Sequence, residues 1–298
     1  MVLESWASNM ITIEKILQQH RDWLSQSEGM IAQELEYLKE DLSSNNLSAL
    51  DNVSDSLGML ATYYGIKGVL SVSDGVLSGW DDVSKSINYR YWALKIRAKS
   101  FSKTAFLQGV KAIPNLTNQM GNAGCLLACF IASNRDDMAS SVADVLLGML
   151  TIKGAVDSGY LMQRKFEPFI TWLYSVYLGK DISPEIEFSN LGVYQKIIDS
   201  WDKPDDLSFA ITELCKYHLS NADDTGGSWD PEFKNPPFDL LPLEVKAISV
   251  VRQKLGLVTP SVDHSLLSSA TSSVENLSII PDDLSNEVES VYNGFFCN

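Results

Sequence analysis

Apolar side chains recur every three or four positions along most of this chain, and no other feature of the sequence limits its possible folds so strongly. The first two stripes contain Ile13, Ile16, Leu17, His20 and Leu24, then Ile31, Leu35, Leu38 and Leu42. This spacing matches the α-helix, which has about 3.6 residues per turn, and no segment shows the alternation of a half-buried strand. The sequence therefore predicts an all-α fold of about nine to eleven helices, packed side by side as helical hairpins in a solenoid-like manner.

Breaks in the apolar pattern set the expected helix boundaries. A third stripe over residues 50–64 is expected to end at Gly65 and Gly68. The longest stripe covers residues 83–105 and must end before Pro114, because proline cannot continue a helix interior. Further helices are expected over residues 116–132, 137–153, 160–178, 191–202, 206–220 and 242–255.

The chain changes character between residues 221 and 241, where glycine, proline and acidic residues replace the apolar stripes. Two glycines stand at 226–227, and prolines occupy positions 231, 236 and 237. We therefore predict a long acidic loop over residues 221–241, and loops of this length in compact domains are often functional. For the whole chain we expect a single all-helical domain over residues 1–298, with a soft division near 110–115.

The charge balance is strongly acidic, which narrows the classes of partner. The chain has 38 Asp and Glu residues against 23 Lys and Arg residues, a formal net charge of −15. Such a chain repels nucleic-acid phosphates and anionic lipid surfaces, so we expect neither nucleic acid nor a membrane as a partner. A basic protein is the natural electrostatic partner, and the alternative is that the acidity only keeps the chain in solution.

The N-terminal residues and the cysteines predict a cytoplasmic protein. Residues 1–6 contain no basic region followed by an apolar one, so they do not resemble a secretory signal. The longest strongly apolar stretch, residues 125–132, is too short to span a bilayer. Four cysteines in a chain of this length do not make a disulfide framework.

Basic residues concentrate in one segment. Residues 83–135 contain eight basic and no acidic side chains. Within it, Lys95, Lys99 and Lys103 stand at every fourth position, with Arg90 and Arg97 nearby and aromatic residues such as Trp92 and Phe101 interleaved with these basic residues. Such a mixture can stack bases and hold phosphates. The alternative, which the acidity of the remaining chain favours, is that the aromatic stripe faces the core and the basic side chains pair with acids.

No catalytic or metal-binding constellation is complete. Cys215 and His218 stand three positions apart, but zinc needs three or four protein ligands, and His218 also continues an apolar stripe, so we expect a hydrogen-bonded core histidine. Residues 263–265 have the residue types of a catalytic triad, but neighbours in sequence lack triad geometry. Cys125 and Cys129 are expected to be buried as small apolar side chains. We expect no catalytic residue, metal or cofactor and no enzymatic activity, with a motif-free enzyme of dispersed carboxylates as an alternative.

A resemblance to a known family is carried by residues near the end of the chain. Its motifs are Leu-Cys-Lys-Tyr-His-Leu at 214–219, Pro-Pro-Phe-Asp-Leu-Leu-Pro-Leu-Glu at 236–244, Leu-Gly-Leu at 255–257 and Val-Asp-His-Ser-Leu-Leu at 262–267. This pattern resembles the all-helical immunity protein family forty-nine of bacterial polymorphic toxin systems. The likeness covers residues 205–268 best and the basic helix near 85–105 more weakly. It implies a non-enzymatic inhibitor that binds and blocks a cognate secreted toxin by stoichiometric occlusion.

The same residues also have an architectural explanation. Asp239 or Pro242 can begin the helix that follows the loop, and Glu244 suits the first turn of that helix. Gly256 suits a left-handed position at its end. The shared motif can therefore be structural only, and a helical scaffold or regulatory adaptor is an alternative function.

Acidic residues in and before the loop form our predicted partner-binding face. Together with one tryptophan they are Asp202, Asp205, Asp206, Asp223, Asp224, Trp229, Asp230 and Glu232. Tryptophan is enriched among binding hot spots, and clustered acids speed association with a basic partner such as a toxin domain. The alternative is a solvated loop whose Trp229 folds back onto the helices.

Overall fold

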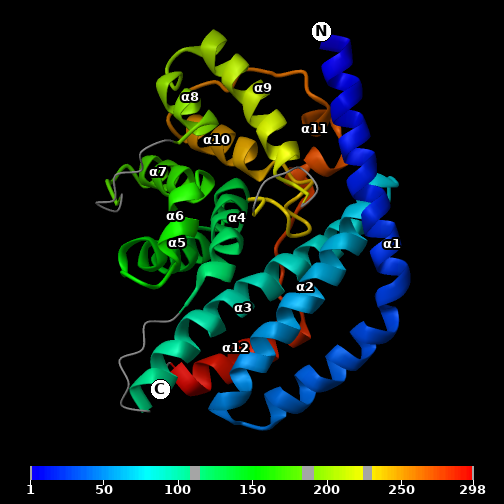
Figure 1. Ribbon diagram of the computed structural model, residues 1–298, viewed down its shortest axis with the longest axis vertical. Helices are drawn as coiled ribbons and strands as arrows, with labels where there is room; N and C mark the ends of the chain where they lie inside the picture. Colours follow the sequence, from blue (N-terminus) through cyan, green and yellow to red (C-terminus); the bar gives the residue numbers. More distant parts are fainter. Residues whose placement is uncertain (1, 108–114, 183–190, 224–229, 297–298) are drawn as a thin grey trace.

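The computed structural model describes residues 2–107, 115–182, 191–223 and 230–296, and every regular element in these ranges is helical (Figure 1). The α-helices are α1 (Val2–Ser43), α2 (Leu50–Ser73), α3 (Gly79–Leu107), α4 (Met120–Ala132), α5 (Asp136–Thr151), α6 (Ser158–Gln163), α7 (Phe166–Leu178), α8 (Val193–Asp199), α9 (Pro204–Ser220), α10 (Leu243–Lys254), α11 (Ser265–Ser268) and α12 (Asp283–Phe296). The short 3₁₀ turns are η1 (Leu47–Ala49), η2 (Thr117–Gln119), η4 (Ala270–Ser272) and η5 (Val274–Asn276). The all-α prediction is confirmed, with twelve α-helices in the described ranges against the nine to eleven predicted.

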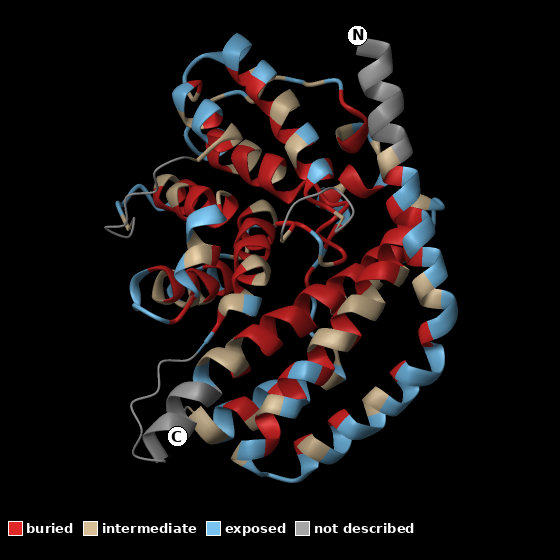
Figure 2. Cartoon of the chain, in the orientation of Figure 1, coloured by how far each residue is buried: buried red, intermediate tan, exposed pale blue. Residues whose placement is uncertain are grey.

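Helix α1 is a single curved helix of 42 residues along one side of the molecule (Figure 1). At about 1.5 Å per residue it is ~63 Å long. Its two apolar stripes belong to one helix, because most of the polar residues that separate them lie on its exposed outer face (Figure 2). The helix ends before Asn45, whose backbone has a positive φ of 48°. Asn46 then caps η1 by accepting a hydrogen bond from the backbone N–H of Ser48.

Helices α2 and α3 form a closely packed hairpin, and α1 lies against α2 (Figure 1). The close packing depends on glycine. A Cβ atom at Gly68 would come within 2.7 Å of Val83, and one at Gly65 within 2.8 Å of the backbone of Pro236. The expectation that the helix ends at these glycines is wrong, since α2 continues to Ser73. Both positions need a small residue for packing, and neither ends the helix.

The second half of the chain is arranged around α4. Helix α4 contacts α5, α7 and α10, and α12 returns from the end of the chain to contact α3. In a solenoid each unit contacts only its neighbours in the sequence. The hairpins of this chain therefore close on one another, and contacts between distant parts of the sequence hold them together.

Other helix boundaries differ from the prediction in two places. The single helix expected over residues 160–178 is divided into α6 and α7 at Arg164 and Lys165. Helices α11 and α12 lie beyond the last predicted helix, in a stretch for which no helix was expected. Pro114 and most of the soft division near 110–115 lie outside the described residues.

The buried apolar side chains form one continuous cluster that extends from Ile13 in α1 to Tyr292 in α12. The segment 230–242, yellow in Figure 1, passes through the middle of the molecule between the α2–α3 hairpin and the helices α9 and α10. Its apolar side chains, including Phe233 and Phe238, belong to this core. This part of the predicted loop is therefore an interior element of the fold. No helix in the described ranges is long and apolar enough to cross a membrane.

Candidate partner-binding surface

His218 of α9 lies at the centre of a buried polar network. Its Nδ1 atom is 2.7 Å from Oε1 of Glu244 in the first turn of α10, and its Nε2 atom donates to the carbonyl oxygen of Asp239 at 3.0 Å. The imidazole also stacks on the ring of Phe233, with the two ring centroids 4.3 Å apart. The prediction of a hydrogen-bonded core histidine is confirmed, since the residue has no exposed surface.

A second histidine, His20, links α1 to Asp239 of the interior segment 230–242. Nε2 of His20 lies 2.7 Å from Oδ2 of Asp239. Burial alone would lower the pKa of both His20 and His218, but attraction to the neighbouring carboxylate outweighs it, so both pKa values are raised above the ordinary 6.5. These contacts hold α1, α9, α10 and the interior segment in one arrangement. Helix α10 begins at Leu243, directly after Pro242, so of the two residues expected to begin it the structure has Pro242 and not Asp239.

Glu232 belongs to a neighbouring network at the start of α7. Its Oε1 atom accepts the backbone N–H groups of Lys165 and Phe166 at 2.8 and 3.2 Å. Its Oε2 atom accepts the hydroxyl of Tyr217 at 2.9 Å. Beside it, Nε of Arg164 donates to both carboxylate oxygens of Glu167, at 3.1 and 3.0 Å, and both side chains are buried. The side chain of Glu232 thus satisfies the first amide groups of α7, which explains why this helix begins here.

The later motif residues also have structural roles. Gly256 has a φ of +74°, which confirms the predicted left-handed position at the end of α10. Leu257 then donates its N–H to the carbonyl oxygen of Arg252 at 2.8 Å, a bond typical of this type of helix end. His264 caps α11, because its Nδ1 atom accepts the N–H of Leu266 at 3.2 Å. Burial, followed by the nearby positive charges of Lys216 and His218, lowers the pKa of His264 to about 4.

The predicted partner-binding residues have different surroundings in the structure: some are buried or paired within the fold, and others are exposed. Placing Glu232 on the surface is wrong, because it is buried and serves the network at α7. Asp230 lies 2.5 Å from Nζ of Lys234 and 3.6 Å from Nη1 of Arg164, and Asp223 lies 2.8 Å from Nζ of Lys15. These acids hold parts of the fold together. Two further members of the predicted face, Asp224 and Trp229, lie outside the described residues.

The remaining acids of the predicted face are brought together on the surface at the junction of α8 and α9. They are Asp202, Asp205 and Asp206, all exposed, and no ion pair within the described part of the chain involves any of them. Asp205 and Asp206 occupy the first turn of α9, where a negative charge is favourable next to the positive end of the helix dipole. We call these three residues the α9 acidic face.

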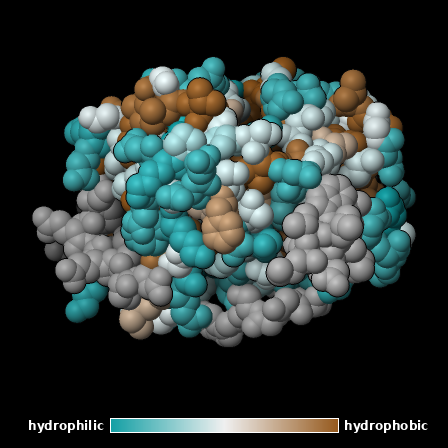
Figure 3. Space-filling view, turned by 90° about the horizontal axis from the view of Figure 1, so that it is seen from above, coloured by the Kyte–Doolittle hydropathy of each residue, from teal (hydrophilic) through white to brown (hydrophobic). Residues whose placement is uncertain are grey.

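A shallow hollow of about 280 Å³ adjoins the α9 acidic face, and Asp206, Asp199, Lys196 and Phe209 line it. The side chain of Phe209 is 61% exposed. Phe209 is absent from the face predicted from the sequence, although a signal was present: this residue stands off the apolar stripe of its helix, which runs through Leu207 and Ile211 to Leu214. Figure 3, which views this end of the molecule from above, shows that hydrophilic side chains cover much of the central surface.

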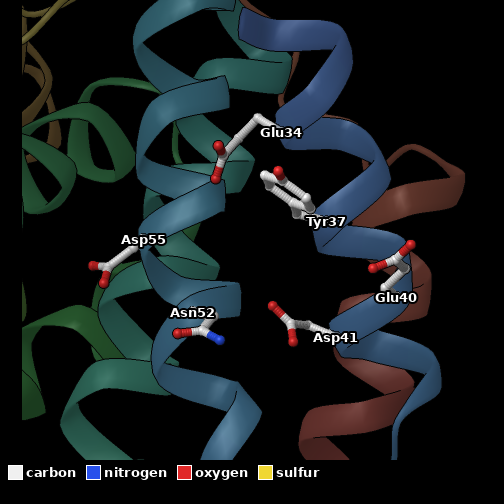
Figure 4. A pocket seen from close by; sticks show the side chains of 6 residues that line it. All are labelled: Glu34, Tyr37, Glu40, Asp41, Asn52 and Asp55. Carbon is white, nitrogen blue, oxygen red and sulfur yellow. The ribbon is translucent and has the colours of Figure 1, made fainter.

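A second acidic hollow lies between α1 and α2 and measures about 390 Å³ (Figure 4). Glu34, Tyr37, Glu40 and Asp41 line it from α1, and Asn52 and Asp55 from α2; the side chain of Asp55 points away from α1 (Figure 4). Two of its acids have partners within the chain. Glu34 accepts the hydroxyl of Ser56 at 2.5 Å, and Asp55 pairs with Arg97 of α3. The contacts of this hollow therefore connect the first three helices.

In the basic helix, α3, the described aromatic side chains face the core, as one of the two interpretations of this segment predicted. Tyr89, Tyr91 and Trp92 are buried. Arg90 is buried too and donates from Nε to the carbonyl oxygen of Pro236 at 3.0 Å. Arg97 pairs with acids of α2. Lys85, Lys95 and Lys99 form no ion pair in the described part of the chain, and the side chain of Lys103 lies outside it.

The cysteines and the acids form no metal centre among the described residues. Cys125, Cys129 and Cys215 are buried, as predicted for the first two, and burial raises the pKa of the Cys129 thiol to about 12. Cys215 and His218 are not part of a metal site, because no group of three or more side chains that could hold a metal ion occurs in the described ranges.

No family model matches the sequence, and neither a curated protein nor a solved structure is found to be similar to it. The likeness to immunity protein family forty-nine therefore depends on the residue pattern itself. In the structure that pattern corresponds largely to the interior segment 230–242 and the two helices packed against it.

Proposed function

We propose that this chain is an immunity protein that binds a basic cognate toxin domain and blocks it by stoichiometric occlusion. One observation carries the proposal: the three exposed carboxylates of the α9 acidic face form no ion pair in the described part of the chain, and one of them, Asp206, lines a hollow together with the exposed ring of Phe209. A basic protein surface would find both charge and an apolar contact there. Interfaces typically combine a central aromatic side chain with charged residues that guide association.

The proposed contact is an arginine or lysine of the toxin placed against Phe209. A cation is attracted to the face of an aromatic ring and would also pair with Asp206 and Asp199 at the same hollow. The chain already shows this preference, because Nζ of Lys196 lies over the Phe209 ring at 6.0 Å from its centroid. The overall charge of −15 would accelerate the encounter with a basic toxin, more strongly at low salt concentration.

The interior residues that carry the family resemblance would make this surface rigid. His218 fixes α9 to α10 through Glu244, and Glu232 fixes the interior segment to α7 and α9. A surface that is ordered before binding loses less conformational entropy in the complex. The family pattern then supports the fold, while surface residues such as Asp205 and Phe209 determine which toxin is bound.

The first experiment is co-purification with the protein encoded immediately upstream of this chain's gene, followed by titration of that protein's toxicity or enzymatic activity. We expect a one-to-one complex by light scattering and complete inhibition at one equivalent. Inhibition far below one equivalent would contradict occlusion and indicate catalysis. Capture of several unrelated proteins at once would support a scaffold instead.

The α9 acidic face is tested by replacing its acidic residues with neutral ones. Basic replacements are avoided, because a positive charge at the start of α9 would also destabilise the helix. The variant Asp202→Asn/Asp205→Asn/Asp206→Asn with Phe209→Ala should bind the toxin at least about tenfold more weakly, which equals about 1.4 kcal/mol. The matched control is Asp283→Asn/Glu287→Gln/Glu289→Gln, which changes the charge equally on exposed residues of α12. If both variants bind equally well, the α9 acidic face is not the contact.

A further inference from the structure

An apolar groove of about 340 Å³ lies where α3, α5 and α12 meet. This volume falls within the range of small-molecule sites, about 300–1,000 Å³. Its apolar lining includes Val145 and Met149 from α5, Ile152 directly after that helix, and Leu116 before η2. The backbone N–H of Leu116 donates to the carbonyl oxygen of Ala155 at 2.7 Å, so one wall is fixed by a hydrogen bond. Ile152 remains 50% exposed at the mouth of the groove.

Lys95 and Lys99 line the same groove from α3. Neither lysine is among the nine basic side chains that pair with a carboxylate in the described ranges. Aromatic rings surround Lys95 instead: its Nζ atom lies 5.3, 5.4 and 5.1 Å from the ring centroids of Tyr91, Trp92 and Tyr292. Rings hold the position of an ammonium group without neutralising its charge.

We propose that this groove binds a small amphiphile with one carboxylate and an unbranched apolar chain, such as a medium-chain fatty acid. The carboxylate would accept charge-assisted hydrogen bonds from Lys95 and Lys99, and the apolar chain would cover Val145, Met149 and Leu116. In a chain of net charge −15, two lysines that form no ion pair in the described ranges and lie next to an apolar surface provide the charge that such an anion requires. Asp144 is the single acid of the lining, so the groove carries a net positive charge.

Decanoate is a suitable probe, measured by isothermal titration calorimetry below its critical micelle concentration against the full-length chain. Decanol tests the need for charge, and decylammonium tests its sign. We expect decanoate to bind at least about tenfold more tightly than either compound, because only it can pair with both lysines. A short peptide that ends in an apolar residue serves as the protein-like alternative.

Three variants test the position of the probe. Lys95→Gln/Lys99→Gln should weaken decanoate binding about tenfold or more, whereas Asp144→Asn should strengthen it. Gly148→Met should also weaken it, since this glycine lines the groove and a Cβ atom there meets only Ile152, at 3.8 Å. The matched controls are Lys39→Gln and Gly29→Met on α1, both at exposed positions, and neither should change the affinity.

Several results would overturn the proposal. Decylammonium that binds as tightly as decanoate would show that the lysines do not select an anion. Decanoate binding that survives in Gly148→Met, or that falls equally in Gly29→Met, would place the probe elsewhere. Binding of the peptide without binding of decanoate would assign the groove to a protein partner.

Discussion

Nδ1 of His218 lies 2.7 Å from Oε1 of Glu244, and neither side chain has more than 1% of its surface exposed. This pair joins the last turn of α9 to the first turn of α10 across the interior segment. Removing one member of a buried pair leaves the other without a partner in a medium that solvates it poorly. The stability of the C-terminal half therefore depends on both side chains being present together.

Glu244→Ala should lower the free energy of unfolding by about 3–5 kcal/mol, because it leaves the His218 imidazole unpaired in the core. His218→Ala should have an effect of similar size. The double variant should cost clearly less than the sum of the two, and urea denaturation of all four proteins measures this coupling. Strictly additive losses would mean that the two residues do not interact in the folded chain.

The raised pKa of His218 predicts how its contribution changes with pH. Below pH 6.5 the imidazole is protonated in both the folded and the unfolded chain, so its stabilisation is fully present. Above pH 6.5 the unfolded chain loses its proton first, and the free energy of unfolding falls until the pH passes the folded pKa. Urea denaturation between pH 6 and 9 should therefore show a smaller decline for His218→Gln than for the unmodified chain. His20→Gln should reduce the decline separately, because the pKa of His20 is also raised.

The lowered pKa of His264 predicts the opposite trend on the acid side. Between pH 6.5 and about 4 only the unfolded chain takes up the proton, so the free energy of unfolding falls as the pH falls. A protonated Nδ1 can no longer accept the N–H of Leu266, and the cap of α11 is lost. His264→Asn should keep a cap and remove this part of the pH dependence, whereas His264→Ala should cost about 1 kcal/mol at neutral pH. Identical pH profiles for His264→Asn and the unmodified chain would exclude the histidine as the cause.

The helical class could be predicted because it depends on local spacing of apolar residues, which the sequence displays directly. Helix boundaries depend on contacts with distant residues, and these were predicted less well. Glu232 determines where α7 begins, from a position about 66 residues later in the chain. Gly65 interrupts the apolar stripe of α2 but does not end the helix. A glycine is needed at this position because the backbone of Pro236 packs against it.

The candidate surface could be predicted in part for a similar reason. Asp205 and Asp206 were recognised from the clustering of acids at a helix start, and they are exposed. Asp223 and Glu232 belong to the same cluster in the sequence, but the fold pairs one with Lys15 and buries the other. Acidic composition does not reveal which carboxylates have partners, because the partners are far away in the sequence.

Gly65→Ala should destabilise the chain by about 1–3 kcal/mol, since the added methyl group would lie 2.8 Å from the carbonyl carbon of Pro236 and the neighbouring backbone cannot move away easily. The matched control is Gly58→Ala in the same helix, where a Cβ atom meets nothing within 4 Å. That change should stabilise the helix by up to about 1 kcal/mol, because alanine has the higher helix propensity. Thermal denaturation of both variants gives the comparison, and a gain of stability in both would show that α2 and the interior segment are not in close contact.

Glu232→Ala separates the role of a buried acid from that of an exposed one. The substitution leaves the first amide groups of α7 and the hydroxyl of Tyr217 without their acceptor, so we expect a loss of about 1–3 kcal/mol in the free energy of unfolding. The folded variant should still bind the upstream-encoded protein with unchanged affinity, because this side chain does not reach the surface. The neutral variant of the α9 acidic face should show the reverse, with weaker binding and only a small loss of stability from the missing charges at the start of α9. Weaker binding by folded Glu232→Ala, measured at a temperature where it is fully native, would restore Glu232 to the binding surface.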